Sequence, residues 1–191
     1  MTSRIGLFGG SFDPPHLGHL IAAQAAAEQL ELDCVLWIPT GESYHKTGTG
    51  SAEHRVEMVR LAIADQPVFE LSTVDVDRSG PTYSYDTVQD IRLAYPEAEL
   101  IFLLGEDAWR DVPNWHRSAE LADMVSFAVI NRNDFRGDSE LTSLRLVTIP
   151  EIGIASSLCR DRVSAGYSLK YWVPEAVREY IVQHHLYSED A

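Results

Sequence analysis

The sequence contains little lysine and no excess of basic charge. Lys46 and Lys170 are the only lysines among 191 residues, so arginine supplies nearly all of the 15 basic residues. With 29 acidic residues the formal net charge is −14, and the isoelectric point lies near 4.8. Nonspecific binding to nucleic acid or to an anionic membrane requires a basic face. The composition therefore argues against both kinds of partner.

The sequence also lacks the features of secreted and membrane proteins. Its two cysteines, Cys34 and Cys159, are far apart, a pattern typical of neither a disulfide framework nor a zinc site. No apolar run reaches the roughly 18–20 residues of a membrane helix, and the N-terminus has no long apolar signal segment. We therefore expect a cytoplasmic protein.

Repeats, low-complexity tracts and linker-like stretches are absent as well. Hydrophobic residues make up 45% and charged residues 23%, the balance of an ordinary globular protein. This length suits one domain. We predict a single domain over residues 1–191, with helices within 156–183 belonging to it and residues 184–191 forming a frayed polar tail.

Short apolar runs alternate with helical patterns along the chain. The predicted strands are Ile5–Phe8, Cys34–Ile38, Phe69–Val76, Leu100–Leu104, Val125–Ile130 and Leu144–Ile149. The predicted helices are Leu17–Leu30, Ala52–Ala64, Ser84–Ala94, Ser156–Ala165 and Pro174–Gln183, the last with proline in its first turn. This alternation predicts an α/β fold, in which helices cover both faces of a mostly parallel sheet.

In such a sheet, ligands bind outside the carboxyl ends of the strands. The functional residues are therefore expected in the loops that follow the strands, namely Gly9–Gly18, Pro39–Ser51, Asp77–Tyr85, Gly105–Trp115 and Glu151–Ser157.

The first of these loops carries glycines and two histidines, in the run Gly9-Gly10-Ser11-Phe12-Asp13-Pro14-Pro15-His16-Leu17-Gly18-His19. Two glycines after a strand allow a sharp turn with free N–H groups, and the following helix adds its dipole, which predicts an anion site without lysine. His16 and His19 are one helical turn apart, and Gly18 permits close approach of a ligand. Other interpretations remain open: a plain turn, histidines that cap the helix or line a surface, or a metal-binding pair.

This run resembles the GxFDPxHxGH signature of the nucleotidyltransferase superfamily that carries an HxGH motif. The resemblance implies a Rossmann-like nucleotidyltransferase fold. It also implies that the loop holds a nucleoside triphosphate, that the histidines stabilise charge at the α-phosphate, and that an adenylyl or cytidylyl group is transferred.

A second anion site is predicted near the C-terminus, in the run Ile154-Ala155-Ser156-Ser157-Leu158-Cys159-Arg160. Ser156 or Ser157 is a good N-cap, and Arg160 would add a guanidinium in the first helical turn. The run is similar to the ISSTxIR motif of the same superfamily, which grips the β- and γ-phosphates. Ser156 and Arg160 match that motif, whereas Ala155, Ser157 and Cys159 depart from it. A capped helix with an exposed arginine is the simpler alternative.

Three middle segments resemble those of bacterial nicotinate-nucleotide adenylyltransferases. They are Pro39-Thr40-Gly41 with His45-Lys46 and the helix from Ala52, the PTYTxDT-like run Pro81–Thr87, and Gly105-Glu106-Asp107 with Trp115. The closing run Tyr171–Ile181 matches the family's YxVPxxVxxYI, so the motifs follow family order over Ile5–Ile181.

These segments indicate the acceptor site. A cation can meet a mononucleotide phosphate, loop N–H groups can hold a pyridine carboxylate, and a tryptophan can stack on an aromatic base. The residues expected to bind nicotinate mononucleotide are Lys46, Arg55, Thr82, Tyr83 and Trp115. Simpler interpretations are a solvated helix arginine, a loop capped by Ser84 and a core or lid tryptophan.

The resemblance implies an enzyme of NAD biosynthesis that joins ATP to nicotinate mononucleotide and releases pyrophosphate. The mononucleotide phosphate attacks the α-phosphorus in line, without a covalent intermediate, and Mg²⁺ arrives with ATP rather than at a protein metal site. Catalysis is assigned to His16, His19 and Arg160. The ATP contacts are assigned to Gly9, Gly10, Ser11, Phe12, His16, His19, Gly105, Asp107, Ser156 and Arg160, with Asp107 accepting from ribose hydroxyls or, more simply, capping a turn.

Other functions stay open at this point. They are a phosphopantetheine adenylyltransferase, an enzyme that prefers the amide form of the mononucleotide, and a nucleotide sensor without catalysis. The runs Trp172–Val173 and His184–Tyr187 fit either internal packing or the interface of a homo-oligomer.

Overall fold

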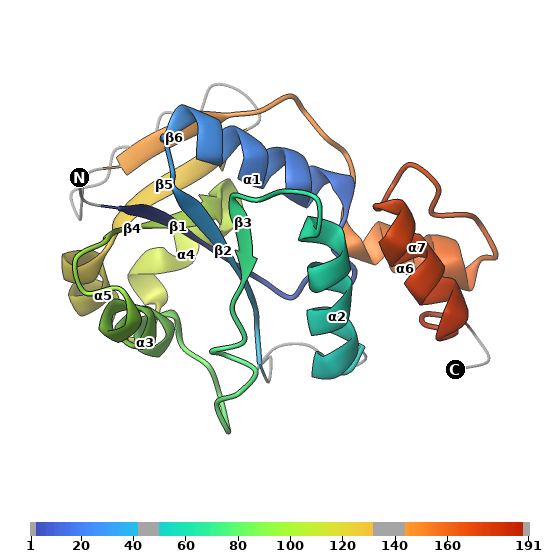
Figure 1. Cartoon of the computed structure of the whole chain (residues 1–191), viewed down its shortest axis with the longest axis horizontal. Coiled ribbons are helices and arrows are strands. Elements are labelled where there is room, and N and C mark those ends of the chain that lie inside the picture. The colour runs from blue at the N-terminus through green and yellow to red at the C-terminus, as the bar shows by residue number, and fades with distance from the viewer. Residues whose placement is uncertain (1–2, 42–49, 132–143, 189–191) are drawn as a thin grey trace.

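The computed structural model describes residues 3–41, 50–131 and 144–188, and a six-stranded parallel sheet lies at its centre (Figure 1). The strand order is β3-β2-β1-β4-β5-β6, and each neighbouring pair is parallel. The strands are β1 Arg4–Gly10, β2 Cys34–Pro39, β3 Phe69–Leu71, β4 Glu99–Gly105, β5 Ser126–Asn131 and β6 Leu144–Thr148. The predicted α/β fold with a parallel sheet is confirmed.

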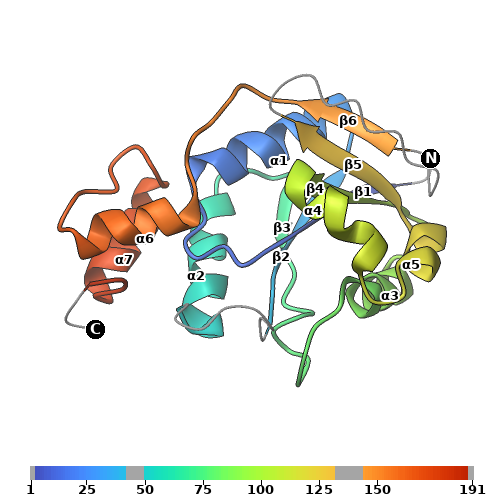
Figure 2. The same ribbon diagram turned by 180° about the vertical axis from the view of Figure 1, so that it is seen from behind.

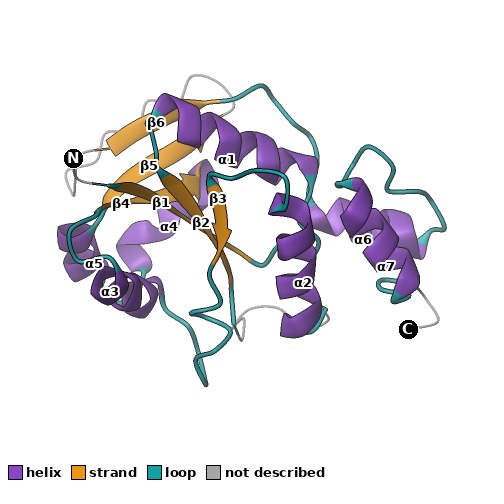
Figure 3. Ribbon diagram, in the orientation of Figure 1, coloured by secondary structure: helices purple, strands orange, loops and turns teal. Residues whose placement is uncertain are grey.

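Helices cover both faces of the sheet, which explains why the strands are apolar on both sides. Leu100 to Leu104 of β4 are all buried, for example. One face packs against α1 Leu17–Gln29 and α2 Ala52–Ile63, and the other against α3 Ser84–Ala94, α4 Glu106–Asp111 and α5 Ser118–Met124 (Figure 3).

Two further helices, α6 Ser156–Ser164 and α7 Glu175–Gln183, lie together beside α2 (Figure 2). Each face of the sheet has its own apolar cluster, and a third apolar cluster joins these helices. It contains Met58 of α2, Cys159 of α6 and Val177 of α7. Val173 is buried in this cluster and Trp172 packs against it, so the run Trp172–Val173 packs internally. That the helices within 156–183 belong to the same domain as the sheet stays a prediction.

Some predicted boundaries were wrong. The strand predicted as Phe69–Val76 ends at Leu71, and a turn follows in which Asp77 N–H donates to the Thr73 carbonyl. Pro174 is the N-cap of α7 and not a residue of its first turn. The segment Gly105–Trp115, predicted to be a loop, contains α4 and a 3₁₀ turn, η1 Val112–Asn114. Helices this short give too few repeats for a periodic pattern to be recognised.

The tail predicted to fray from residue 184 is instead packed as far as the structure describes it. His184, His185 and Leu186 donate backbone hydrogen bonds to α7, and Leu186 and Tyr187 pack against the third cluster. Within 3–41, 50–131 and 144–188, no helix combines the length and the apolar character that crossing a membrane requires.

Candidate active site

A cavity of about 770 Å³ opens at the carboxyl ends of β1, β4 and β5. The chain leaves β1 toward β2 on one side and continues through β4 to β5 on the other, so β1 and β4 flank the point where strand order reverses. Ligands of doubly wound sheets bind at this point, and the volume lies within the range of small-molecule sites. The cavity is therefore the candidate active site.

This cavity brings together every residue that the sequence assigned to ATP. They come from the end of β1, the start of α1, the β4–α4 junction and the start of α6: Gly9, Gly10, Ser11, Phe12, His16, His19, Gly105, Asp107, Ser156 and Arg160. Their assignment to ATP stays a prediction, but their convergence is an observation.

The two glycines of the loop are the last residues of β1, paired with Ile38 and Pro39, and not the turn that the sequence suggested. Gly10 permits a close approach of the Phe12 ring, since a Cβ there would lie only 3.1 Å from it. Phe12 itself has a left-handed backbone (φ 47°), which costs a non-glycine residue about 1–2 kcal/mol. Burial of its ring, 5.2 Å from the His19 ring centroid, offsets that cost.

His16 and His19 form a reciprocal cap on α1. The backbone N–H of His19 donates to His16 Nδ1 (3.3 Å), and the backbone N–H of His16 donates to His19 Nδ1 (3.2 Å). The two rings stack, with centroids 3.6 Å apart. Gly18 makes room for this arrangement, since a Cβ there would lie 3.0 Å from His16 Nδ1. The alternative that the histidines cap the helix is thus correct for His16, and both rings line the cavity.

The cap also defines the protonation of His19. Because Nδ1 accepts a hydrogen bond, the proton of the neutral ring lies on Nε2. Burial lowers the pKa of His19 well below its usual value, and the neighbouring His16 lowers it further. His19 is therefore a neutral hydrogen-bond donor at pH 7.

The predicted anion site of α1 has fewer free N–H groups than expected. Leu17 N–H donates to the Trp172 carbonyl (2.9 Å), and His19 N–H is occupied by the cap. The histidine side chains, rather than a row of free amides, thus face the cavity at this helix end.

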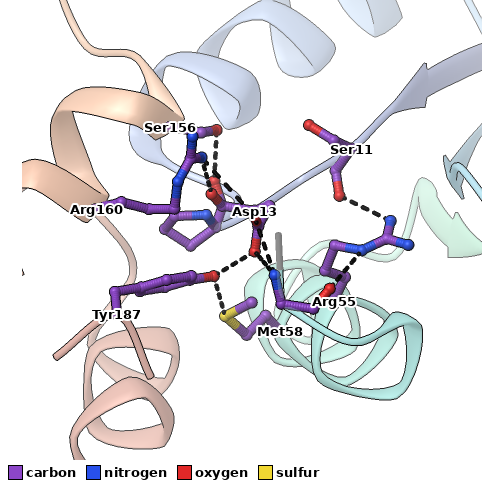
Figure 4. Close-up of polar contacts among 9 residues, drawn as sticks. Ser11, Asp13, Arg55, Met58, Ser156, Arg160 and Tyr187 are labelled. Carbon is purple, nitrogen blue, oxygen red and sulfur yellow. Dashed lines mark hydrogen bonds and ion pairs between the residues drawn. The ribbon is translucent and has the colours of Figure 1, made fainter. Parts of the chain in front are cut away.

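Ser156 and Arg160 of α6 line the cavity (Figure 4). Both form hydrogen bonds to residues 11–16 between β1 and α1, which we call the histidine loop. Ser156 Oγ donates to the Pro14 carbonyl (2.9 Å), and Arg160 donates to the Asp13 carbonyl (2.7 Å). Two expectations need correction: Ala155 is the N-cap, without a side-chain bond, and Arg160 is the fifth residue of the helix, just beyond the first turn in which it was predicted. Position five of a helix still projects toward its N-terminus, which brings the guanidinium to the loop.

Asp107 lies in the first turn of α4 and lines the cavity, although α4 has no side-chain cap, so the capping alternative fails. Its neighbour Glu106 also lines the cavity and forms an ion pair with Arg110. A cation thus partly neutralises the carboxylate that would otherwise repel phosphate.

Arg55 is buried, which excludes the interpretation as a solvated helix arginine. Its guanidinium donates to the carbonyls of Ser11, Gly41 and Gly50 at 3.1–3.3 Å. In the described conformation it organises backbone around the cavity, and a phosphate contact remains a prediction. Lys46 lies outside the described residues.

The remaining acceptor residues lie apart from the cavity lining. Thr82 lies close to Gly41: a Cβ on Gly41 would be 3.2 Å from Thr82 Cγ2. The carbonyl of Gly41 accepts a hydrogen bond from Arg55. Tyr83 is the N-cap of α3, so Ser84 does not cap it, and its exposed ring contacts His116 (4.6 Å between centroids). Trp115 is half-buried, with its ring edge-on to Phe102 (5.9 Å).

Several lining residues were not foreseen. Ile130, Ile149, Ile152 and Ile154 give the cavity an apolar wall. Ile152 and Ile154 belong to the loop Glu151–Ser157 that the topology had singled out, and alternating isoleucines there were the available signal. The sequence motifs assigned no role to Asp13, although it lies within the run Gly9–His19.

The described residues contain no group of three or more His, Cys, Asp and Glu able to hold a metal ion. Cys34 and Cys159 are free thiols, and burial raises their pKa values to about 12 and about 11. Thiols protonated at neutral pH are poor nucleophiles.

Comparison with known proteins gives consistent matches. A family model described as cytidylyltransferase-like matches residues 7–162. A curated relative from Thermus thermophilus is 43% identical over 184 residues, which cover 96% of this chain and 99% of the relative. One from Clavibacter michiganensis is 43% identical over 188 residues, with 96% and 94% covered. Both are named "probable nicotinate-nucleotide adenylyltransferase".

Solved structures share the fold. The Plasmodium falciparum nicotinic acid mononucleotide adenylyltransferase complexed with NaAD aligns with a TM-score of 0.81 at 22% identity. The same enzyme complexed with APC gives 0.79 at 21% identity. Each alignment covers 97% of both chains.

Proposed function

This chain belongs to the cytidylyltransferase-like family and, within it, to the nicotinate-nucleotide adenylyltransferases, and from that premise we propose how its cavity works. The enzyme transfers the adenylyl group of ATP to nicotinate mononucleotide, which yields nicotinate adenine dinucleotide and pyrophosphate. This is the function that the sequence motifs predicted.

The observation that carries the proposal is the composition of the cavity. Two histidines, one serine and one arginine from opposite parts of the chain meet at the switch point of the sheet, next to the backbone of Gly9–Phe12. The apolar wall formed by the four isoleucines supplies a surface for a base. The set thus offers donors for a triphosphate and apolar surface for a base within one cavity.

The reaction requires positioning and charge stabilisation rather than a nucleophile on the protein. An oxygen of the mononucleotide 5′-phosphate forms a bond to the α-phosphorus of ATP, and the bond from that phosphorus to the β-phosphate bridging oxygen breaks as pyrophosphate leaves. His19 and His16 donate to the α-phosphate oxygens, where negative charge accumulates in the transition state. Ser156 and Arg160 bind the β- and γ-phosphates, and Asp107 accepts from the ribose hydroxyls.

The acceptor side of the proposal depends on the residues around Gly41. Thr82 and Tyr83 bind the pyridine carboxylate through loop N–H groups, and Trp115 stacks on the pyridine ring. Lys46 and Arg55 neutralise the mononucleotide phosphate. The proximity of Thr82 to Gly41, whose carbonyl accepts from Arg55, supports a common location for Thr82 and Arg55.

A divalent cation accompanies ATP as part of the substrate. We propose Mg²⁺ for this cation. Small molecules are the expected partners, and a cytoplasmic location agrees with two free thiols.

The test is pyrophosphate release from ATP and Mg²⁺ with each acceptor in turn. We expect the highest kcat/KM with nicotinate mononucleotide. Faster release with nicotinamide mononucleotide would move the preference to the amide, and release only with phosphopantetheine would assign the chain to the rival enzyme. Nucleotide binding without release, with every acceptor, would indicate a sensor.

A further inference from the structure

Asp13 is a fully buried carboxylate at the junction of the histidine loop, α2 and α6. A buried charge requires donors or counter-charges, because its desolvation costs several kcal/mol. Asp13 belongs to the recognised run, but neither the sequence nor the proposed mechanism gives its carboxylate a role.

Among residues 3–41, 50–131 and 144–188, two groups donate hydrogen bonds directly to the carboxylate. Tyr187 donates its hydroxyl proton to Oδ1 at 2.6 Å, and the Gly50 backbone N–H lies 3.3 Å from both oxygens. Arg160 is further away, with its nearest nitrogen 3.8 Å from Oδ2 (Figure 4). The Tyr187 bond is thus the shortest that this carboxylate receives from the part of the chain that the structure describes.

The position of Arg160 is the important detail. Its short hydrogen bond, 2.7 Å, goes to the carbonyl of Asp13 and not to the carboxylate. At 3.8 Å the carboxylate attracts the guanidinium without forming a direct hydrogen bond. Arg160, which is partly exposed and lines the cavity, therefore keeps donors available for an anion.

Tyr187 suits a permanent donor role. Burial raises the pKa of Tyr187 strongly, and the Asp13 charge raises it further, so the hydroxyl keeps its proton. Without this hydroxyl, Asp13 would lose its shortest hydrogen bond while staying buried. Among the described cations, Arg160 is the one that forms an ion pair with Asp13, whereas the hydrogen bonds of Arg55 go to backbone carbonyls, so Arg160 is the cation placed to replace the hydroxyl.

We propose that Tyr187 is a positioning residue for the triphosphate side of the site: its hydroxyl satisfies the Asp13 carboxylate and so leaves Arg160 free to bind phosphate. The inference rests on the proposed function only in the role of Arg160 toward ATP. Tyr187, in the last described turn of the chain, thus influences ATP binding through Asp13 and Arg160 without touching the substrate.

The first test removes the hydroxyl alone. In Tyr187→Phe, we expect the KM for ATP to rise about 3- to 10-fold, with the KM for nicotinate mononucleotide and kcat changing less than twofold. The matched control is Tyr180→Phe, whose hydroxyl bonds His54 Nδ1 (2.8 Å) on α2, away from Asp13. A purely structural role for Tyr187 would change both KM values together, and an unchanged ATP KM would overturn the proposal.

The second test is a double-mutant cycle with Arg160→Ala. If Tyr187 acts through Arg160, adding Tyr187→Phe to Arg160→Ala leaves the ATP affinity within twofold of the single Arg160 variant. Additive losses would contradict the proposal. Asp13→Asn gives an independent check: neutralising the carboxylate in the Tyr187→Phe background should restore ATP affinity, and failure to restore it counts against the mechanism.

ATP affinity in these tests is measured by calorimetric titration of MgATP without an acceptor, alongside turnover. The titration examines the coupling of Tyr187 to Arg160 even if the acceptor is not nicotinate mononucleotide. A failed coupling with normal turnover would overturn this inference alone, whereas MgATP binding without turnover on any acceptor would overturn the proposed function alone.

Discussion

The imidazoles of His16 and His19 stack 3.6 Å apart, and each ring accepts the backbone N–H of the other residue. The pair is thus a helix cap and a cavity wall at once. Because the cap occupies Nδ1 of His19, a ligand can reach this ring only through Nε2. Loss of either ring therefore affects the helix end as well as the chemistry, and tests must separate the two effects.

His19→Ala should lower kcat by about 10²-fold or more, the range for a lost electrostatic contact to the transition state. The cap loses only one of its two bonds, so we expect a fall in stability of about 0.5–2 kcal/mol. Steady-state turnover and thermal melting of the same preparation measure both. Turnover equal to that of the wild type would remove His19 from the mechanism.

The stability of the protein should decrease as the pH falls below about 6.5. The pKa of His19 is lower in the folded than in the unfolded chain, so the unfolded chain binds more protons in that range. The free energy of unfolding then falls by up to about 1.4 kcal/mol per pH unit between about 6.5 and the folded pKa. Denaturant melts from pH 7.5 to 5 should show a smaller loss in His19→Gln, and equal losses would contradict the assignment.

Arg55→Met should destabilise the fold by about 2–4 kcal/mol, because three backbone carbonyls lose a charged donor. Arg60→Met is the matched control on the same helix. Arg60 is exposed and pairs only with Glu57 among its recorded contacts, so its loss should cost less than about 0.5 kcal/mol. Equal midpoints in urea for the two variants would show that the Arg55 bonds contribute little.

Trp115→Ala should raise the KM for nicotinate mononucleotide by about fivefold or more, with a smaller effect on ATP, if the indole stacks on the pyridine ring. Trp115→Phe keeps a flat face and should recover most of the affinity. Because Trp115 also contacts Phe102 in the core, thermal melting must accompany the kinetics. A parallel rise of both KM values would assign Trp115 to packing.

The sheet was predictable because its strands are apolar on both faces and are separated by helical repeats long enough to recognise. The end of β3 and the helices of the segment 105–124 were not, for a physical reason. β3 has three residues and ends in a turn stabilised by Thr73 and Asp77, and α4 and α5 cover at most two turns each. Such short elements are determined by tertiary contacts rather than by periodic sequence.

The ATP side of the candidate site was predictable as a set of residues but not as a network of contacts. Motif spacing identified His16, His19, Ser156 and Arg160, yet it could not show that the last two bond to the carbonyls of Pro14 and Asp13. Those bonds depend on the packing of α6 and α7 against α2, which no local pattern records. For the same reason Tyr187 looked like part of a loose tail.

The bonds between the histidine loop and the C-terminal part of the chain join residues 142 to 174 positions apart. Contacts of such separation close large loops, and they are expected to form late in folding. A chain that stops before residue 156 contains both histidines but lacks Ser156, Arg160 and Tyr187, whose side chains donate to Pro14 and Asp13. On the proposed mechanism, ATP binding therefore requires that these late contacts have formed. A nucleotide that binds only the native state stabilises the protein against unfolding by mass action.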